Sequence, residues 1–294
     1  MDNNIKLKLF NDKYYATPYD KNQDCLLSVL VCCRMTRGIG GPTDILQLLS
    51  SIFQYWSPLH QSQTEILIKF DLDDELAIHE LLEKGLIEKL VADFGSPSPP
   101  KIRYFIYNRW EGKKTFNYHY NFLFSQRNPK SKLIGFATDD SFYQGDILNK
   151  VGDLDKPAIY LRSNIIETVL KSINDYRSPE ELRKWACGEL TDPYPFVSSS
   201  LIEYAGSMGW QQNIDNWLSL LGAIVYKKYN INLFQNIPIV IQRKTDERPG
   251  LEARNYSKFN EEMFVDDTTF PKNDYYFKLI EQQAKNIYLN MKGQ

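Results

Sequence analysis

The chain has 294 residues, of which 43% are hydrophobic and 24% are charged, and its formal net charge is −2. That length and apolar content predict two globular domains with their own cores and exclude a disordered chain. The near-neutral charge excludes a surface that is basic overall, so any contact with nucleic acid must come from a local patch. The sequence has 4 cysteines, none in a CxxC pair, and 3 histidines, so we expect no structural zinc site.

The amino-terminal segment and the apolar runs bear on location. Residues 1–6 contain no apolar signal core, and no run approaches the roughly 18 apolar residues that a membrane span needs. Three of the cysteines lie in the apolar stretch 25–33, where buried thiols in a reducing compartment are the expected state. We therefore expect a cytoplasmic protein without a membrane partner.

Residues 24–56 are predicted to be helical, with a break at 37–42. The break is rich in glycine and ends in Pro42, after which Thr43 or Asp44 can cap a helix from Ile45 to Tyr55. Glycines in such a break can also cradle a phosphate group, but this segment lacks the GK[ST] ending and no clear strand precedes it. We therefore interpret it as a turn.

Residues 64–90 form the first copy of a pattern that occurs twice, in which a short amphipathic helix, a break and a second apolar-periodic helix end at a glycine. Ile66, Leu67 and Phe70 mark the first helix, and Leu81 and Leu82 mark the second. The alternating stretches 86–94 and 101–108 are predicted to be strands joined by the proline-rich loop 95–100. Between positions 71 and 90, seven acidic residues oppose two lysines, which indicates either a solvated face or a surface that docks a protein.

The middle of the chain is predicted to be β-rich. Segments 115–124 and 133–137 have strand-like composition, and the polar, turn-rich stretch that follows places a linker at 139–163. Basic side chains between Lys101 and Lys132 are interleaved with aromatic ones. Such a cluster can stack the bases of an unpaired strand, but alternating aromatic residues more often pack across strands, which is the interpretation we favour.

Residues 203–228 form the second and clearer copy of the pattern, after predicted helices at 164–176 and 178–190. Ala205 permits close helix approach and Gly209 supplies a tight turn. The next helix presents one apolar face, made of Ile214, Trp217, Leu218 and Leu221. Strands are predicted at 223–229 and 237–243, and a last helix at 274–291 follows a long irregular segment.

This repeated pattern resembles tandem winged-helix domains, which belong to the helix-turn-helix superfamily. The resemblance implies an α+β fold with two winged-helix-like domains and an intervening β-rich segment. The first domain, with a β-rich extension, would span 1–138 and the second 164–248. The linker 139–163 would separate them, and 249–294 would hold an irregular segment and a C-terminal helix. Winged-helix domains mainly bind nucleic acid and also dock proteins.

The resemblance also implies a DNA-binding surface on the second copy. Amide side chains at the start of a recognition helix suit the edges of bases, and cations in a wing suit phosphates. We therefore predict that duplex DNA is contacted by Gln211, Gln212, Asn213, Asn216, Lys227, Lys228, Arg243 and Lys244. The amides are also compatible with a simple polar cap.

These patterns predict a DNA-binding specificity or adaptor component of a larger nucleic-acid-processing, defence or regulatory assembly, without a cofactor, metal or catalytic residue. Two alternatives stay open. In the first, the chain is a protein-interaction subunit without DNA contact, whose partner binds the acidic helix 71–90. In the second, it is a metal-dependent nuclease, in which the strand 239–241 leads into Gln242, Arg243 and Lys244 and a carboxylate comes from Glu203 or Asp215. No GxSxG pattern supports a hydrolase, so a binding protein is expected rather than an enzyme.

Overall fold

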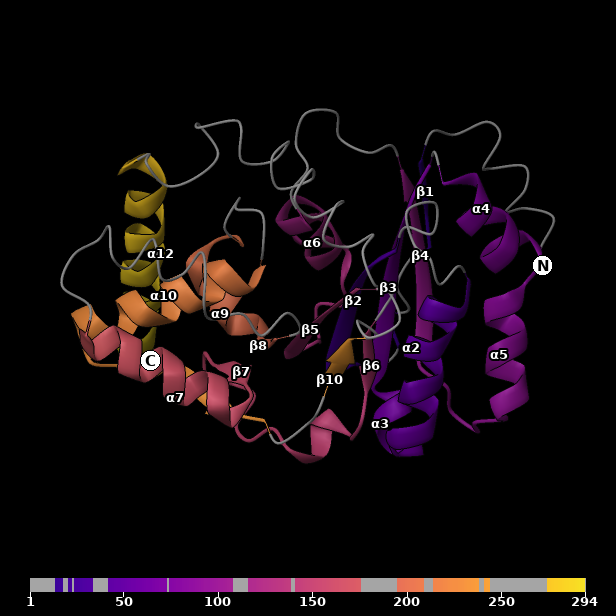
Figure 1. The fold of residues 1–294 in the computed structure, drawn as a ribbon, viewed down its shortest axis with the longest axis horizontal. Coiled ribbons are helices and arrows are strands. Elements are labelled where there is room, and N and C mark those ends of the chain that lie inside the picture. The colour runs from indigo at the N-terminus through magenta and orange to yellow at the C-terminus, as the bar shows by residue number, and fades with distance from the viewer. Residues whose placement is uncertain are drawn as a thin grey trace, which may run out of the picture. The chain divides into compact units, whose positions relative to one another are not determined.

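A computed structural model of the chain describes residues 14–17, 21–22, 24–33, 42–72, 74–107, 116–138, 141–175, 195–208, 214–237, 241–243 and 274–293. The chain divides into two compact units (Figure 1). The first unit comprises Met1–Lys113, Phe122–Val151 and Ile239–Lys244, and the second comprises Lys114–Asn121, Gly152–Pro238 and Thr245–Gln294. The domain boundaries expected from the sequence stay a prediction.

A mostly parallel sheet forms the centre of the first unit. Its strands are β1 (Tyr14–Ala16), β2 (Leu27–Cys33), β3 (Thr64–Asp71), β4 (Lys101–Tyr107) and β5 (Leu133–Thr138). Their order is β1-β4-β3-β2-β5, and only β1, at the edge, is antiparallel to its neighbour. Every residue of β2 and β3 is buried, as expected for central parallel strands that helices cover on both faces.

Helices connect these strands. The connection from β2 to β3 holds α2 (Pro42–Tyr55) and α3 (Pro58–Ser62), and the connection from β3 to β4 holds α4 (Glu75–Ala77), the π-helical turn η1 (Ile78–Glu83) and α5 (Leu86–Phe94). The connection from β4 to β5 holds α6 (Phe116–Gln126). Among the described residues, no helix is long and apolar enough to cross a bilayer.

The helices lie on opposite faces of the sheet. On one face, the hydroxyl of Tyr104 donates to Glu88 of α5 at 3.4 Å. On the other face, the rings of Phe105 and Tyr107 contact Phe122 of α6, with centroids 5.9 and 4.9 Å apart. Because successive side chains of β4 point to opposite faces, α5 and α6 cover different sides, as right-handed crossover connections require.

A short two-stranded sheet packs beside α2. It pairs β6 (Ser141–Tyr143) with β10 (Ile241–Arg243) in antiparallel register, and the 3-10 turn η2 (Ile147–Asn149) follows β6. The backbone N–H of Tyr143 donates to the hydroxyl of Ser51 on α2 at 2.9 Å, and the Tyr143 and Trp56 rings lie 5.1 Å apart. These contacts hold the segment after β5 against α2.

The second unit combines a small sheet with longer helices. In the sheet, β7 (Ile159–Leu161) pairs with β8 (Phe196–Ser198) and β9 (Phe234–Asn236). The helices are α7 (Ser163–Asp175), α9 (Ser199–Ala205), α10 (Ile214–Tyr229) and α12 (Asp274–Lys292). The indole N–H of buried Trp217 donates to Gln283 of α12, and the Gln283 amide donates to the carbonyl of Ser207, both at 2.9 Å. These bonds tie α10 and α12 to the turn after α9.

The winged-helix prediction is wrong, and the chain has an α/β fold in place of the expected α+β fold. Residues 64–71 form β3 rather than a helix, 86–94 form α5 rather than a strand, and 223–229 continue α10 rather than form a wing. Central strands of a parallel sheet are apolar on both faces, so their pattern resembles that of a buried helix. The parallel pairing of β2 with β3 and β5 has no counterpart in the predicted architecture.

Candidate functional site

The carboxyl ends of the parallel strands meet at one edge of the first unit's sheet. The strands β2, β3, β4 and β5 end there at Cys33, Asp71, Tyr107 and Thr138. The strand order reverses beside β2, because β3 lies on one side of it and β5 on the other. In open α/β sheets, ligands bind outside the carboxyl ends of the strands at such a switch point. This edge is therefore the candidate site.

A buried ion pair lies at the carboxyl end of β3. Lys69 and Asp71 are two residues apart, so they lie on the same face of the strand, and their side chains form an ion pair. The two residues are 2% and 4% exposed. The Lys69 ammonium also lies over the ring of Tyr107 on β4, 4.9 Å from its centroid. Two charges and a phenol thus gather at the end of an otherwise apolar strand.

Polar groups also gather at the end of β5. The backbone N–H of Thr138 donates to the hydroxyl of Ser141 at 3.0 Å, and the two hydroxyl oxygens lie 3.2 Å apart. Ser141 begins β6, so these contacts close the turn between β5 and β6. The intervening Asp139 and Asp140 lie outside the described residues. Cys32 of β2 lies between Lys69 and Thr138 in the register, which links the ends of β3 and β5 across β2.

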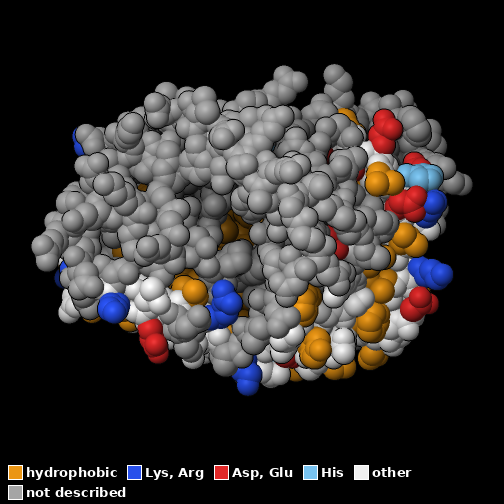
Figure 2. Space-filling model, viewed as in Figure 1, with side chains coloured by type: hydrophobic (Ala, Val, Ile, Leu, Met, Phe, Trp, Pro, Cys, Tyr) orange, Lys and Arg blue, Asp and Glu red, His pale blue; other side chains and the backbone are white. Residues whose placement is uncertain are grey.

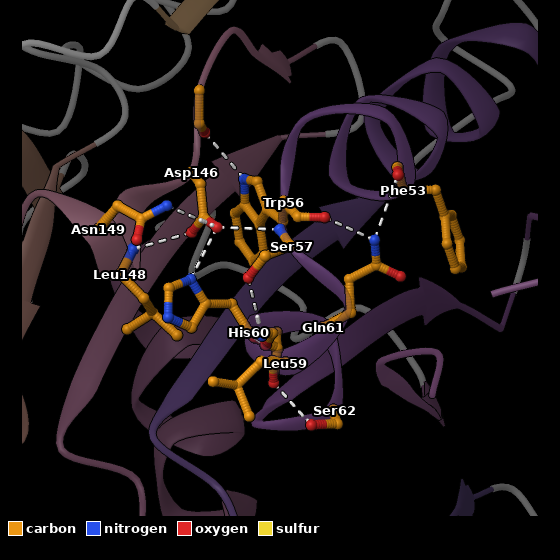
Figure 3. A network of polar contacts seen from close by, with 12 residues as sticks. Phe53, Trp56, Ser57, Leu59, His60, Gln61, Ser62, Asp146, Leu148 and Asn149 are labelled. Carbon is orange, nitrogen blue, oxygen red and sulfur yellow. Dashed lines mark hydrogen bonds and ion pairs between the residues drawn. The ribbon is translucent and has the colours of Figure 1, made fainter. Parts of the chain in front are cut away.

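A second polar network lies at the opposite edge of the sheet (Figure 3). Its centre is the carboxylate of Asp146, in the segment that follows β6. That carboxylate lies 2.7 Å from Nδ1 of His60 and accepts hydrogen bonds from the backbone N–H groups of Ser57 and Leu148 at 2.9 and 3.2 Å, and from the Asn149 amide at 3.2 Å. His60 lies on α3, which leads directly into the amino end of β3.

The His60–Asp146 pair has the geometry of a carboxylate that orients an imidazole, as in hydrolase triads. The Ser57 hydroxyl, however, caps α3 by accepting a hydrogen bond from the His60 backbone N–H at 3.3 Å. The indole N–H of Trp56 donates to the carbonyl of Gly145 at 2.9 Å and so joins the same two segments. We assign this network a structural role, because its bonds fasten residues 145–149 to the α2–α3 corner at the amino edge.

A third polar group lies in the core near the amino end of β3. The carboxylate of Glu65 pairs with Arg103 of β4 at 2.9 Å and accepts hydrogen bonds from Ser28 of β2 and the backbone N–H of Asn128, both at 2.6 Å. Arg103 and Glu65 are 2% and 0% exposed. Burial, with the charge of Glu65 as the next cause, raises the pKa of Cys25 to about 12. This network joins β2, β3 and β4 to the loop that follows α6, so its role is structural.

Hydrophobic side chains are visible on the surface of the first unit in Figure 2, toward the right of the view, where Figure 1 places α3 and α5. Among the described residues of this unit, the large exposed hydrophobic ones are Tyr55, Leu59, Leu76 and Phe94. Exposed apolar side chains are normal on a folded protein, and nothing in the structure shows what would cover these.

The residues predicted to contact DNA fall in different places. Lys227 and Lys228 are exposed in the last turn of α10, and Lys228 pairs with Glu281 of α12 at 2.6 Å. Arg243 ends β10 in the first unit, and Asn216 belongs to α10 in the second. The remaining predicted contacts lie outside the described residues: Gln211, Gln212, Asn213 and Lys244. The role of each residue stays a prediction, but residues 223–229, which were expected to form a strand of the wing, continue the helix α10.

The prediction of a duplex DNA partner is therefore wrong, and so is that of an acidic docking helix. The segment 71–90 is divided between the end of β3, the helical turns α4 and η1, and α5. Asp71 and Asp74 are buried, and Asp74 caps α4 by accepting from the backbone N–H of Ala77 at 3.4 Å. Glu80 pairs with Lys84 at 2.7 Å. The acidic residues thus form no single exposed face.

The nuclease alternative also fails. It needed a carboxylate on a strand beside 239–243, but β10 pairs with β6, whose sequence Ser-Phe-Tyr contains none. Glu203 and Asp215 lie on the helices α9 and α10. Within the part of the chain that the structure describes, no group of His, Cys, Asp and Glu side chains could hold a metal ion.

Comparison with known proteins finds no matching family model and no matching curated protein. Several solved structures are similar. The bifunctional glycosyltransferase WbbM has a TM-score of 0.43 at 13% identity, over 94% of this chain and 52% of WbbM. TarS of S. aureus has 0.41 at 13%, over 72% of this chain and 35% of TarS. The 4-diphosphocytidyl-2C-methyl-D-erythritol synthase of Anaerococcus prevotii has 0.40 at 11%, over 74% of this chain and 88% of that one. Because these TM-scores lie below 0.5, the location of the binding site proposed below rests on this chain's own strand order and residues.

Proposed function

We propose that this chain binds a nucleotide at the carboxyl edge of the first unit's parallel sheet and transfers a group from it. The observation that carries the proposal is the parallel strand order β4-β3-β2-β5. In chain order these strands correspond to 3-2-1-4, the arrangement in which doubly wound folds bind nucleotides beside the first strand. A transferase replaces the DNA-binding adaptor as the hypothesis for this protein.

The distribution of polar residues supports this edge as the binding site. The amino edge is occupied by the His60–Asp146 network, and the Glu65–Arg103 pair is enclosed in the core nearby, so both sets of polar groups are used to join elements of the fold. At the carboxyl edge, Lys69 and Asp71 lie at the end of β3, and hydroxyl groups lie at the end of β5. Such groups supply the donors and acceptors that orient a polar ligand.

The reaction class is the second part of the proposal. A fold of this kind hosts many chemistries, so strand order alone does not select one. Two of the structures compared above are named as a glycosyltransferase and a diphosphocytidyl synthase, and glycosyl or nucleotidyl transfer is the reaction that we propose to test first. A cytoplasmic location, expected from the cysteine usage, completes the proposal.

Calorimetric titration tests the proposal. The full chain would be titrated separately with UDP, CDP, GDP and ADP in a buffer containing MgCl2, with inorganic phosphate as the control ligand. We expect saturable binding of at least one nucleotide with a Kd below about 1 mM, equivalent to about −4 kcal/mol. Sugar conjugates of the nucleotide that binds would then be assayed for release of the free nucleoside diphosphate. Absence of binding by a folded protein, shown by circular dichroism, would contradict the proposal.

A further inference from the structure

The Lys69–Asp71 ion pair is unusual for its place in the fold. It lies on a central strand, where the residues from Ile66 to Phe70 are otherwise apolar and fully buried. Removing two charges from water costs free energy that their attraction often does not recover, so apolar residues at these positions would stabilise the sheet as well or better. Stability alone therefore does not account for the pair.

The Glu65–Arg103 pair is an example of an ion pair with a structural role in this sheet. Its carboxylate receives hydrogen bonds from Ser28 of β2, from the backbone of Asn128 and from Arg103 of β4, so it fastens several elements together. The ion pair between Lys69 and Asp71 joins two residues of the same strand, and Lys69 also lies over the ring of Tyr107 on β4. It lies at the end of β3 that faces the switch point, whereas Glu65 lies at the opposite end.

We propose that Lys69 is a positioning residue for the nucleotide site and holds the Asp71 carboxylate at the end of β3, where it accepts a hydrogen bond from the ligand. This inference rests on the proposed function. The Lys69 ammonium contacts Asp71 and also the ring of Tyr107, so it is held from two sides and fixes the carboxylate in turn.

The chemistry of Asp71 defines what it can recognise. An ionised carboxylate only accepts hydrogen bonds, so its ligand group is a hydroxyl or an N–H of the nucleotide rather than a phosphate oxygen. A neighbouring cation favours the ionised form of a carboxylate, which is the form that this role needs. Asp71 is the last residue of its strand, so its carboxylate lies where the chain leaves the sheet toward α4.

The test compares two buried ion pairs whose carboxylates, Asp71 and Glu65, lie on one face of β3. In the site variant, Lys69→Met is combined with Asp71→Asn, and in the control variant Arg103→Met is combined with Glu65→Gln. Each double variant removes both charges, so neither leaves a buried charge without its partner. A third variant, Lys69→Arg, keeps a cation beside Asp71. Each protein is titrated with whichever of UDP, CDP, GDP and ADP the parent binds, and its thermal midpoint is measured in parallel.

We expect the site variant to bind the nucleotide about tenfold or more weakly than the parent, because a hydrogen bond to a charged group is lost. The control variant should change the affinity by no more than about twofold, because distant sites act independently. Lys69→Arg should keep the affinity close to that of the parent, which a role in packing alone would not predict.

Three other outcomes would overturn this inference. Unchanged affinity in a folded site variant would overturn the role of Lys69 and Asp71 and leave the proposed function intact. An equal loss of affinity in the control variant would show that the effect comes from a general loss of order, which also overturns the inference. If the parent binds none of the four nucleotides, the proposed function and this inference fail together.

Discussion

The packing of α10 against β9 in the second unit can be tested with one substitution, because the two elements approach closely at Gly222. A Cβ atom added at Gly222 would lie 2.4 Å from Cζ and 2.8 Å from Cε1 of the Phe234 ring. Phe234 is only 3% exposed, so its ring has little room to withdraw. Two effects of Gly222→Ala oppose each other: alanine favours the helix by about 1 kcal/mol, and overpacking costs about 1–3 kcal/mol. Because the contact falls below the distance that real Cβ atoms show, we expect the second effect to win.

The expected result is a loss of about 2 kcal/mol in the free energy of unfolding, because so short a contact places the overpacking cost near its upper value of about 3 kcal/mol and helix propensity recovers about 1 kcal/mol. Urea unfolding followed by circular dichroism measures it as a lower midpoint at an unchanged slope. A smaller residue at the contact, Phe234→Leu, should make the Gly222→Ala substitution less costly in the double variant than alone. Gly152→Ala is the control, since nothing lies within 4 Å of its added Cβ. A Gly222→Ala variant as stable as the parent would refute the packing of α10 on β9.

Three further predictions concern the core. Leu81→Ala and Leu218→Ala remove fully buried side chains, so each should cost about 2–5 kcal/mol, and an unchanged thermal midpoint in either would show that the helix face is assigned wrongly. Burial raises the pKa of Cys25 from 9.0 to about 12, so its native thiol should resist alkylation at pH 8. The thiol of the unfolded chain ionises at a lower pH than the native thiol, so the free energy of unfolding should fall as the pH rises above about 9. Cys25→Ala should reduce that fall. Rapid alkylation of Cys25 in the native protein would contradict the raised pKa. Arg103→Met alone leaves Glu65 buried without its cation and should cost about 3–5 kcal/mol, most of which Glu65→Gln in the same chain should recover, as urea midpoints would show.

Several elements could be predicted from the sequence because they are bounded by clear signals. The strand predicted at 101–108 is β4, the strand at 133–137 lies within β5, and the helices at 164–176 and 274–291 match α7 and α12. The helix from Ile45 to Tyr55 is the greater part of α2. In each case a turn or a change of composition marks the limits of the element.

The errors have physical causes in particular residues. The run from Leu27 to Cys33 is apolar throughout because β2 is buried on both faces, and such a run is compatible with a helix as well as a strand. Gly222 suggested the end of a helix, but α10 continues through it, and the glycine is explained by the nearby ring of Phe234. In both cases a contact with an element distant in the sequence determines the secondary structure, and the local sequence does not show that contact.

The candidate site depends on strand order and so could not be predicted. Lys69 and Asp71 lie in the segment 64–90, which the sequence pattern predicts to be helical, and Asp71 is one of the seven acidic residues counted in it. Lys69 lies beside Cys32, and Cys32 beside Thr138, only when β3 and β5 pair with opposite sides of β2. The dipeptide Asp139-Asp140, which was interpreted as the start of a linker, follows directly after β5.

Hydrogen exchange of the full chain, with and without the nucleotide that binds, tests the central claim most directly. The claim is that the ligand lies at the carboxyl edge of the parallel sheet. It predicts slower exchange in peptides that contain the strand ends at Cys33, Asp71 and Thr138, and unchanged exchange around His60 and Asp146 at the amino edge. Protection around His60 and Asp146 without protection at the three strand ends would contradict it.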